Sequence, residues 1–489
     1  MSRYRAGIRQ HGTHRELAGG RKPGETLRVG ASGLDAIIVP GSRPAAYLDH
    51  AVTLARAANC SLVILCSHYL HACEVKEYLD ARSFRGAIII ELSPEYSHPL
   101  FCFPGLLEIK DDLPSACGNH ITDLSMKRNV GLVLAKMMGW RRIFFLDDDI
   151  RDIAYPDLQR TVGMLSSFSA AGMWVTDFPD NSIVCHANRE TGGSQDVFVS
   201  GAALAVDCES DIGFFPDIYN EDWLFFFDAA SKGELGNSCL KATQLYYYPF
   251  ANAGRAAWQE FGDLIAEGLY ALLHLGLEVE QATSRYWARF IEARRNFLED
   301  TLSRVSEAPA DMQVEIAASL YSALKCLSGI TPDLCARYVK AWREDLKHWK
   351  RRWADIHEMP SVGAAVAALG LVAIRSDGAN RILHPQDRIT LAPVPGPVTI
   401  PQSDTVREMA VSMNAWRPPP LDVKRDTLPL EVVIPFEVPR WWHRVQRRIS
   451  PLIPSGFVGE RHVVSAPTSA AASRARGEPE SSVPTVSLS

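Results

Sequence analysis

The chain has 489 residues, enough for two or three domains, and its 47% hydrophobic and 22% charged residues allow a core of ordinary size. The formal net charge of −6 gives no sign of nucleic-acid binding. The ten cysteines are scattered, with no CxxC pair and no zinc-site spacing, so we expect reduced thiols in a cytoplasmic protein.

Residues 1–33 are polar, basic and rich in glycine, and we expect them to be disordered. They contain no apolar stretch of the kind found in secretory signals. The longest apolar run, residues 362–374, is shorter than the ~20 residues that span a bilayer. These features predict a protein without a transmembrane helix.

Strands and helices are expected to alternate within residues 34–250. Short branched apolar runs predict strands at 35–39, 61–66, 87–92 and 143–146. Apolar residues at helical spacing predict helices at 47–58, 71–81 and 126–138. This order predicts an α/β fold with a mostly parallel sheet flanked by helices. Strand-like runs at 173–176, 197–200 and 202–206 follow.

The second half of the chain divides into three parts. Residues 251–376 are expected to be helical, either as a separate domain or as helices that wrap the sheet. Residues 377–458 are Pro-rich and expected to be extended, and residues 459–489 to be disordered. Within the Pro-rich part, residues 440–449 (RWWHRVQRRI) fit either a helix packed on the protein or a weak peripheral contact with an anionic membrane surface.

Three adjacent acidic residues, Asp147, Asp148 and Asp149, follow the strand predicted at 143–146. Their carboxylates repel one another at the end of an apolar strand, and a divalent cation would remove that cost. Mg2+ and Mn2+ prefer oxygen ligands and bridge carboxylates to phosphates. The alternative is an acidic turn that caps the following helix.

Two further groups suit phosphate binding and proton transfer. Lys127, Arg128 and Asn129 begin the helix before the acidic triplet, where they are expected near the carboxyl end of the next strand and could hold a pyrophosphate. A solvated basic helix start is the alternative. Glu221 and Asp222 precede an apolar run and fit either a helix cap or a general base for a sugar hydroxyl.

Four sequence blocks carry a family resemblance. They are residues 39–44 (VPGSRP), 127–149 (KRNVG, then Ala135, Gly139 and FFLDDD), 200–206 (SGAALAV) and 213–222 (GFFPDIYNED). In this order they resemble the first strand and loop, the "RNxG…A…G…fLDxD" block, the strand that follows and the "GxFdE…ED" block of family-2-like glycosyltransferases of the GT-A fold. The similarity covers about residues 34–232.

The resemblance implies an inverting transfer of a sugar from a nucleotide-sugar, with UDP-sugars favoured, to the hydroxyl of an unknown acceptor. It implies Mg2+ or Mn2+ as cofactor, held by Asp147 and Asp149, and Asp222 as the base, with Glu221 beside it. The donor-binding residues implied by this resemblance are Pro40, Arg43, Lys127, Arg128, Asn129, Asp147 and Asp148.

The sequence also departs from the family pattern. The second strand ends in residues 66–68 (CSH), where the family usually has an acidic pair that holds the base, so the donor nucleotide stays open. No QxxRW-type block follows Asp222, which argues against a processive polymer synthase. His186 and His274 are candidates for a further metal ligand, although a lone histidine in an apolar helical stretch is usually structural.

Two other functions are compatible with the sequence. A nucleotidyltransferase also uses carboxylates and a metal on an α/β fold, but the Gly-rich signature after the first strand is missing. A non-catalytic, glycosyltransferase-like binding or scaffold protein has no chemical need for carboxylates at positions 147, 149 and 222. The polar loop at 176–196 could face an acceptor or be a surface excursion.

Overall fold

A computed structural model describes residues 13–14, 16–20, 33–118, 123–176, 178–179, 182–196 and 198–375. The Pro-rich segment, the C-terminal tail and the membrane contact expected at 440–449 lie outside these residues. None of the helices in the described part combines the length and apolar character that crossing a bilayer requires.

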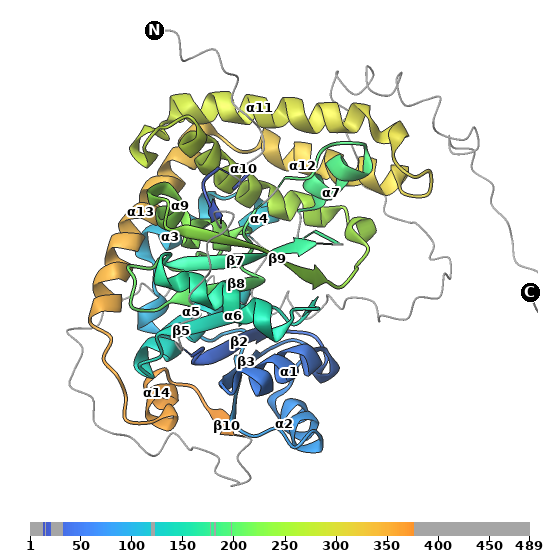
Figure 1. The fold of residues 1–489 in the computed structure, drawn as a ribbon. Helices are drawn as coiled ribbons and strands as arrows, with labels where there is room; N and C mark the ends of the chain where they lie inside the picture. Colours follow the sequence, from blue (N-terminus) through green and yellow to red (C-terminus); the bar gives the residue numbers. More distant parts are fainter. Residues whose placement is uncertain are drawn as a thin grey trace, which may run out of the picture. The chain divides into compact units, whose positions relative to one another are not determined.

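A ten-stranded sheet runs through the described residues (Figure 1). Its parallel centre has the order β5-β2-β3-β4, with β2 at Ala36–Gly41, β3 at Ser61–Cys66, β4 at Ala87–Glu91 and β5 at Arg142–Leu146. The bounds of these strands agree with the sequence prediction to within two residues. The fold is therefore α/β, as predicted.

The rest of the sheet is mixed. Strand β8 (Ala203–Asp207) runs antiparallel to both β5 and β7 (Ala170–Thr176), and β9 (Leu235–Gln244) is parallel to β7. Short strands β1 (Gly19–Gly20) and β6 (Ile150–Arg151) pair with β9, and β10 (Ala373–Arg375) pairs with β4. Strand β9 was not predicted, and residues 198–200, expected to belong to a strand, lie outside any strand.

The helices of the first part lie between or beside these strands. They are α1 (Asp49–Ala58), α2 (Ala72–Ala81), α3 (Pro104–Glu108), α4 (Ser115–Gly118), α5 (Leu124–Met137), α6 (Tyr155–Gly163), α7 (Ile183–Glu190), α8 (Glu221–Phe225) and α9 (Phe227–Lys232).

Helix α5 approaches the sheet closely, and this approach positions the candidate site. Because side chains alternate along a strand, Ile37 of β2 packs in the core with α1 while Ile38 faces α5. A Cβ on Gly131 of α5 would lie 2.9 Å from Ile38 Cγ2. Only glycine lets the helix sit this near, and the start of α5 is thereby held beside the carboxyl ends of β2 and β5.

Within residues 251–376, which were expected to be helical, lie α10 (Gly254–His274), α11 (Ser284–Ser303), α12 (Gln313–Ser328), α13 (Pro332–Ala354) and α14 (Val362–Ala368). In Figure 1, α10, α11 and α12 lie together at the top of the view. Sheet and helices belong to one compact unit within Met1–Pro397. Trp349 of α13, for example, donates from Nε1 to the Ile212 carbonyl at 3.2 Å.

Residues 13–14 and 16–20, here called the N-terminal strap, were expected to be disordered but pack onto the fold. His14 is fully buried, with its ring 4.2 Å from that of Trp223 and 4.4 Å from that of Tyr270. Val199 N–H donates to His14 Nδ1 at 2.9 Å. Burial lowers the pKa of His14 well below its usual value, so the ring is neutral. The polar composition of the strap gave no sign that His14 is buried.

Candidate functional site

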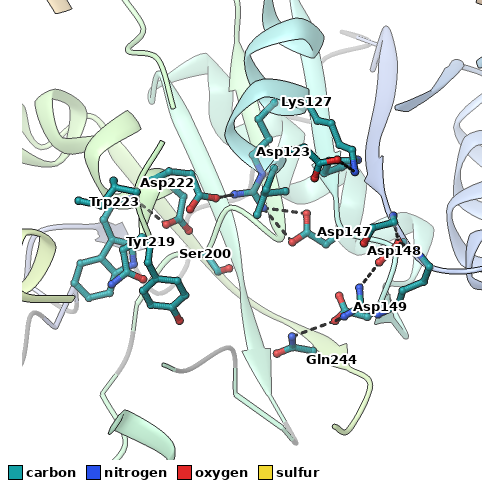
Figure 2. A pocket seen from close by; sticks show the side chains of 18 of the residues that line it. Asp123, Lys127, Asp147, Asp148, Asp149, Ser200, Tyr219, Asp222, Trp223 and Gln244 are labelled. Atoms are coloured by element: carbon teal, nitrogen blue, oxygen red, sulfur yellow. Dashed lines mark hydrogen bonds and ion pairs between the residues drawn. The ribbon is translucent and has the colours of Figure 1, made fainter. Parts of the chain in front are cut away.

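A cavity of about 380 Å³ opens at the carboxyl ends of β2 and β5 (Figure 2). Ligands of α/β sheets bind at such an edge. Every donor-binding, metal-binding or base residue implied by the family resemblance except Asn129 lines it, and these residues come from both strand ends, from α5 and from α8. The lining members of that set are Pro40, Arg43, Lys127, Arg128, Asp147, Asp148, Asp149, Glu221 and Asp222.

Arg128 links the end of β5 to the start of α8. Its side chain is buried, and its Nη2 donates to both carboxylate oxygens of Asp147, at 2.9 and 3.0 Å. Its Nη1 donates to Glu221. A Cβ on Gly201 would lie 2.7 Å from Arg128 Nη1, so the glycine leaves room for the guanidinium. Arg128 thus joins Asp147 and Glu221 in the middle of the cavity.

Arg43 bridges the other two members of the acidic triplet. It pairs with Asp148 and donates to Asp149 at 2.8 Å. Asp148 also accepts the backbone N–H groups of Ser42 and Arg43, at 2.7 and 2.9 Å, and so holds the loop after β2. Gln244 Nε2 lies 3.3 Å from Asp149 Oδ2. Burial raises the pKa of Asp149 to about 6, against the opposing effect of Arg43.

Lys127 and Asn129 both hold neighbouring backbone. Lys127 Nζ donates to the Gly41 carbonyl at 2.7 Å and pairs with Asp123 at 3.2 Å, while burial lowers its pKa. Asn129 was expected to bind the donor, but it lies outside the cavity lining. It donates to the Phe215 carbonyl at 2.7 Å and accepts the Phe215 N–H at 2.8 Å. Asn129 therefore fixes the backbone of Phe215, in the segment before α8.

Glu221 and Asp222 form the first turn of α8 at the cavity wall. Asp222 accepts the N–H groups of Gly201 and Trp223, at 2.6 and 2.9 Å. Burial raises the pKa of Asp222, and it raises the pKa of Glu221 to about 8, although Arg128 acts against the rise in both. A carboxylate with a raised pKa is a stronger base, which suits it to remove a proton from a hydroxyl.

The raised pKa of Glu221 predicts a pH-dependent difference in stability between the wild type and Glu221→Gln. Below about pH 8 the Glu221 carboxyl group keeps its proton in the folded state, whereas in the unfolded chain it loses this proton near pH 4.5. Relative to the variant, the wild type should therefore lose stability as pH rises from about 5 to about 8, by at most ~1.4 kcal/mol per pH unit. Melting temperatures at pH 5.5, 7 and 8.5 test this, and parallel profiles between pH 5.5 and 8 would contradict it.

A buried acidic cluster lies behind α8. Glu260, Asp263 and Glu267 of α10 surround Arg294 of α11 at 2.9, 2.9 and 2.8 Å, and all four side chains are buried. Burial raises the pKa of Glu260 to about 7 and that of Glu267 to about 8. Asn220 Nδ2 donates to Asp263 Oδ1 at 2.9 Å. The cluster therefore anchors Asn220, the residue that precedes Glu221.

The carboxylates at the strand ends have the oxygen ligands that Mg2+ and Mn2+ prefer. In the arrangement described, however, Asp147 pairs with Arg128 and Asp149 with Arg43. Among the described residues, no three His, Cys, Asp or Glu side chains are grouped to hold a metal ion. A metal on Asp149 would have to replace Arg43 there.

Neither histidine proposed as a further metal ligand lines the cavity. His186 is buried and stacks on Phe178 with the ring centres 4.6 Å apart. His274 Nε2 lies 2.6 Å from the Thr13 carbonyl oxygen and so contacts the N-terminal strap. In this arrangement neither histidine is among the cavity residues that could add a ligand to Asp147 and Asp149.

Sequence reasoning missed several lining residues. Gln244 ends the unpredicted strand β9, and Trp258 lies on α10, for which the sequence predicted only a helix. Tyr219 lies within the block that ends in Glu221-Asp222, which could have drawn attention to it. Of the polar loop 176–196, no described residue lines the cavity.

No protein-family model and no curated protein matches this chain. The resemblance to family-2-like glycosyltransferases therefore rests on the four sequence blocks, and a functional assignment rests on the residues of the cavity.

Proposed function

We propose that this protein transfers a sugar from a nucleotide-sugar, with UDP-sugars favoured, to an acceptor hydroxyl. The observation that carries the proposal is the meeting, in one cavity, of three cationic side chains with a carboxylate whose pKa is raised. Arg43, Lys127 and Arg128 supply the cations, and Asp222 is the carboxylate. The cations suit the binding of a diphosphate, and the carboxylate suits the removal of a proton from an attacking hydroxyl.

The donor would lie between the loop after β2 and the start of α5. Its diphosphate would be drawn to the guanidinium groups of Arg43 and Arg128, which hold carboxylates in the arrangement described. Pro40 lines the same end of the cavity and would flank the nucleoside. Residues 66–68, at the end of β3, depart from the family pattern and do not line the cavity, so the proposal leaves the nucleobase of the donor open.

The proposed reaction is a single displacement. The Asp222 carboxylate accepts the proton of the acceptor hydroxyl while that oxygen forms a bond to the anomeric carbon. The bond from the anomeric carbon to the diphosphate oxygen breaks, and the electron pair leaves with the nucleoside diphosphate. The cationic side chains stabilise the charge that develops on this leaving group. An attack from the opposite face inverts the anomeric centre.

Mg2+ or Mn2+ belongs to this proposal as a cofactor of donor binding. Asp149, and Asp147 once released from Arg128, would hold the ion through carboxylate oxygens. When bound, it would add positive charge beside the diphosphate. Only the deprotonated carboxylate of Asp149 can hold the ion, and burial raises the pKa of this group, so metal binding should weaken as the pH falls.

Ligand-dependent melting tests the proposal. We expect one of the UDP-, GDP- or dTDP-sugars to stabilise the wild type in the presence of Mn2+, by ~2.7 kcal/mol at ~100-fold over its dissociation constant. EDTA and Asp149→Ala should each remove most of this stabilisation. Asp157→Ala, which changes an acid of α6 outside the cavity, is the matched control and should behave as the wild type.

The outcomes separate the candidate functions. Stabilisation by one nucleotide-sugar together with release of the nucleoside diphosphate supports a glycosyltransferase. Formation of pyrophosphate from a nucleoside triphosphate and a sugar phosphate would instead indicate a nucleotidyltransferase. Absence of any nucleotide effect at saturating concentration would indicate a non-catalytic binding or scaffold protein.

A further inference from the structure

The cavity has two halves of different chemistry. The acidic triplet and its arginine partners occupy one end, beside β2 and β5. Aromatic side chains line the other end. In Figure 2, Tyr219 and Trp223 lie at the end opposite Asp148 and Asp149, with Asp222 between the two groups. The lining aromatic residues are Phe198, Tyr219, Trp223, Tyr247 and Trp258.

Four of these five rings stay partly open to the cavity. Trp223 is buried against His14 and Tyr270 and belongs to the core. Phe198, Tyr219, Tyr247 and Trp258 are only half-buried. Large rings are among the residues that gain most from full burial. Half-buried rings that share one concave wall therefore present apolar area that a ligand can cover.

Tyr219 and Trp258 form one continuous wall on rigid support. Their ring centres are 5.4 Å apart at an interplanar angle of 59°. Trp258 and Gly262 lie four residues apart on α10 and so share a face of that helix. The Tyr219 carbonyl rests against Gly262, where a Cβ would collide with it. The next residue, Asn220, is anchored by Asp263. The wall is thus held in place before any ligand arrives.

The same end of the cavity carries polar groups around the rings. Ser200 lines it, and the Arg255 guanidinium lies 4.8 Å from the centre of the Tyr247 ring. A sugar ring matches this combination. Its face of C–H groups can stack on the negative face of an aromatic ring, and its hydroxyl groups project from the edge towards polar partners. A simple alkyl alcohol has only its reacting hydroxyl and offers no further polar group to Ser200 or Arg255.

We propose that the aromatic half of the cavity is the acceptor subsite and that the acceptor is a sugar ring stacked on Trp258 and Tyr219. The inference rests on the proposed function, which it deepens by naming the class of acceptor. One hydroxyl of this ring faces Asp222 and gives it a proton. The oxygen then bonds to the anomeric carbon of the donor, whose bond to the diphosphate breaks. The product is a glycoside in which two sugars are joined.

Binding and transfer are measured separately. Saturation-transfer NMR on the full chain is recorded with methyl glycosides of glucose, galactose, mannose and N-acetylglucosamine, and with p-nitrophenol and octanol as non-sugar probes. Transfer to the same probes is then assayed with the nucleotide-sugar that stabilises the wild type. Trp258→Leu is compared with Tyr246→Leu, because Tyr246 is a neighbouring aromatic residue that is 66% exposed and does not line the cavity.

We expect at least one glycoside to bind and to accept sugar. In Trp258→Leu its binding signal should be lost and kcat/KM for the acceptor should fall at least tenfold, mainly through KM, whereas nucleotide-sugar stabilisation persists. Tyr246→Leu should resemble the wild type. Preference for p-nitrophenol or octanol, or equal behaviour of the two variants, would overturn the inference. Glycoside binding without any nucleotide effect would support the sugar subsite and reject the proposed function.

Discussion

Replacing Arg294 with methionine should lower the free energy of unfolding by about 3–5 kcal/mol. The guanidinium has no exposed surface and pairs with Glu260, Asp263 and Glu267 of the buried acidic cluster. Without the guanidinium, three carboxyl groups share a site that water does not reach. All three must then take up protons to remain buried. Urea unfolding of the full chain measures the loss.

The neighbouring Arg295 supplies the control. It lies on the same helix with 39% of its side chain exposed and pairs with Glu292 at the surface. Arg295→Met should cost less than ~0.5 kcal/mol. Replacing Glu260 and Glu267 with glutamine in the Arg294→Met background should restore part of the stability. If Arg294→Met unfolds at the same urea concentration as Arg295→Met, the cluster does not support the fold in the way described.

Asp222→Asn should lower kcat by about 100- to 10,000-fold once donor and acceptor are identified. The amide keeps the size of the side chain and can still accept the Trp223 N–H through Oδ1, but it cannot take the proton of the acceptor. Nucleotide-sugar stabilisation should persist, because the cations of the donor half are unchanged. Initial rates at saturating donor and acceptor measure the effect.

Glu209→Gln controls for the loss of one acidic group, since Glu209 is 61% exposed in the loop after β8. It should keep wild-type kcat. A rate for Asp222→Asn within threefold of wild type, together with a large loss in Glu221→Gln, would move the role of base to Glu221. Glu221 already differs from Asp222 in pairing with Arg128.

The sequence predicted the elements whose signal is local. Strands β2, β3, β4 and β5 are short apolar runs, and α5 carries apolar residues at helical spacing. Because parallel strands end at one edge of a sheet, Asp147 and Arg43 could be placed near each other before any coordinates were known. The convergence of these residues on one cavity follows from topology.

Features set by distant partners could not be predicted. Strand β9 (LGNSCLKATQ) has no alternation of apolar residues, and it forms because β7 offers a pairing edge. Asn129 stands in a motif with charged neighbours, but its two hydrogen bonds go to the backbone of Phe215. The pairing of each arginine with its aspartate depends on side-chain geometry across three elements. A single sequence does not reveal this geometry.

The N-terminal strap has a consequence for how the chain is made. His14 leaves the ribosome before its partner Val199, which lies 185 positions later, and Thr13 contacts His274, 261 positions later. The strap therefore has nowhere to dock while β2 to β5 are being synthesised. A ribosome-bound chain that stops before α10 carries β2 to β5 and the acidic triplet but lacks the ring of Tyr270 that covers His14. The strap can take its final place only after α10 has been made, and His14 then packs against Trp223.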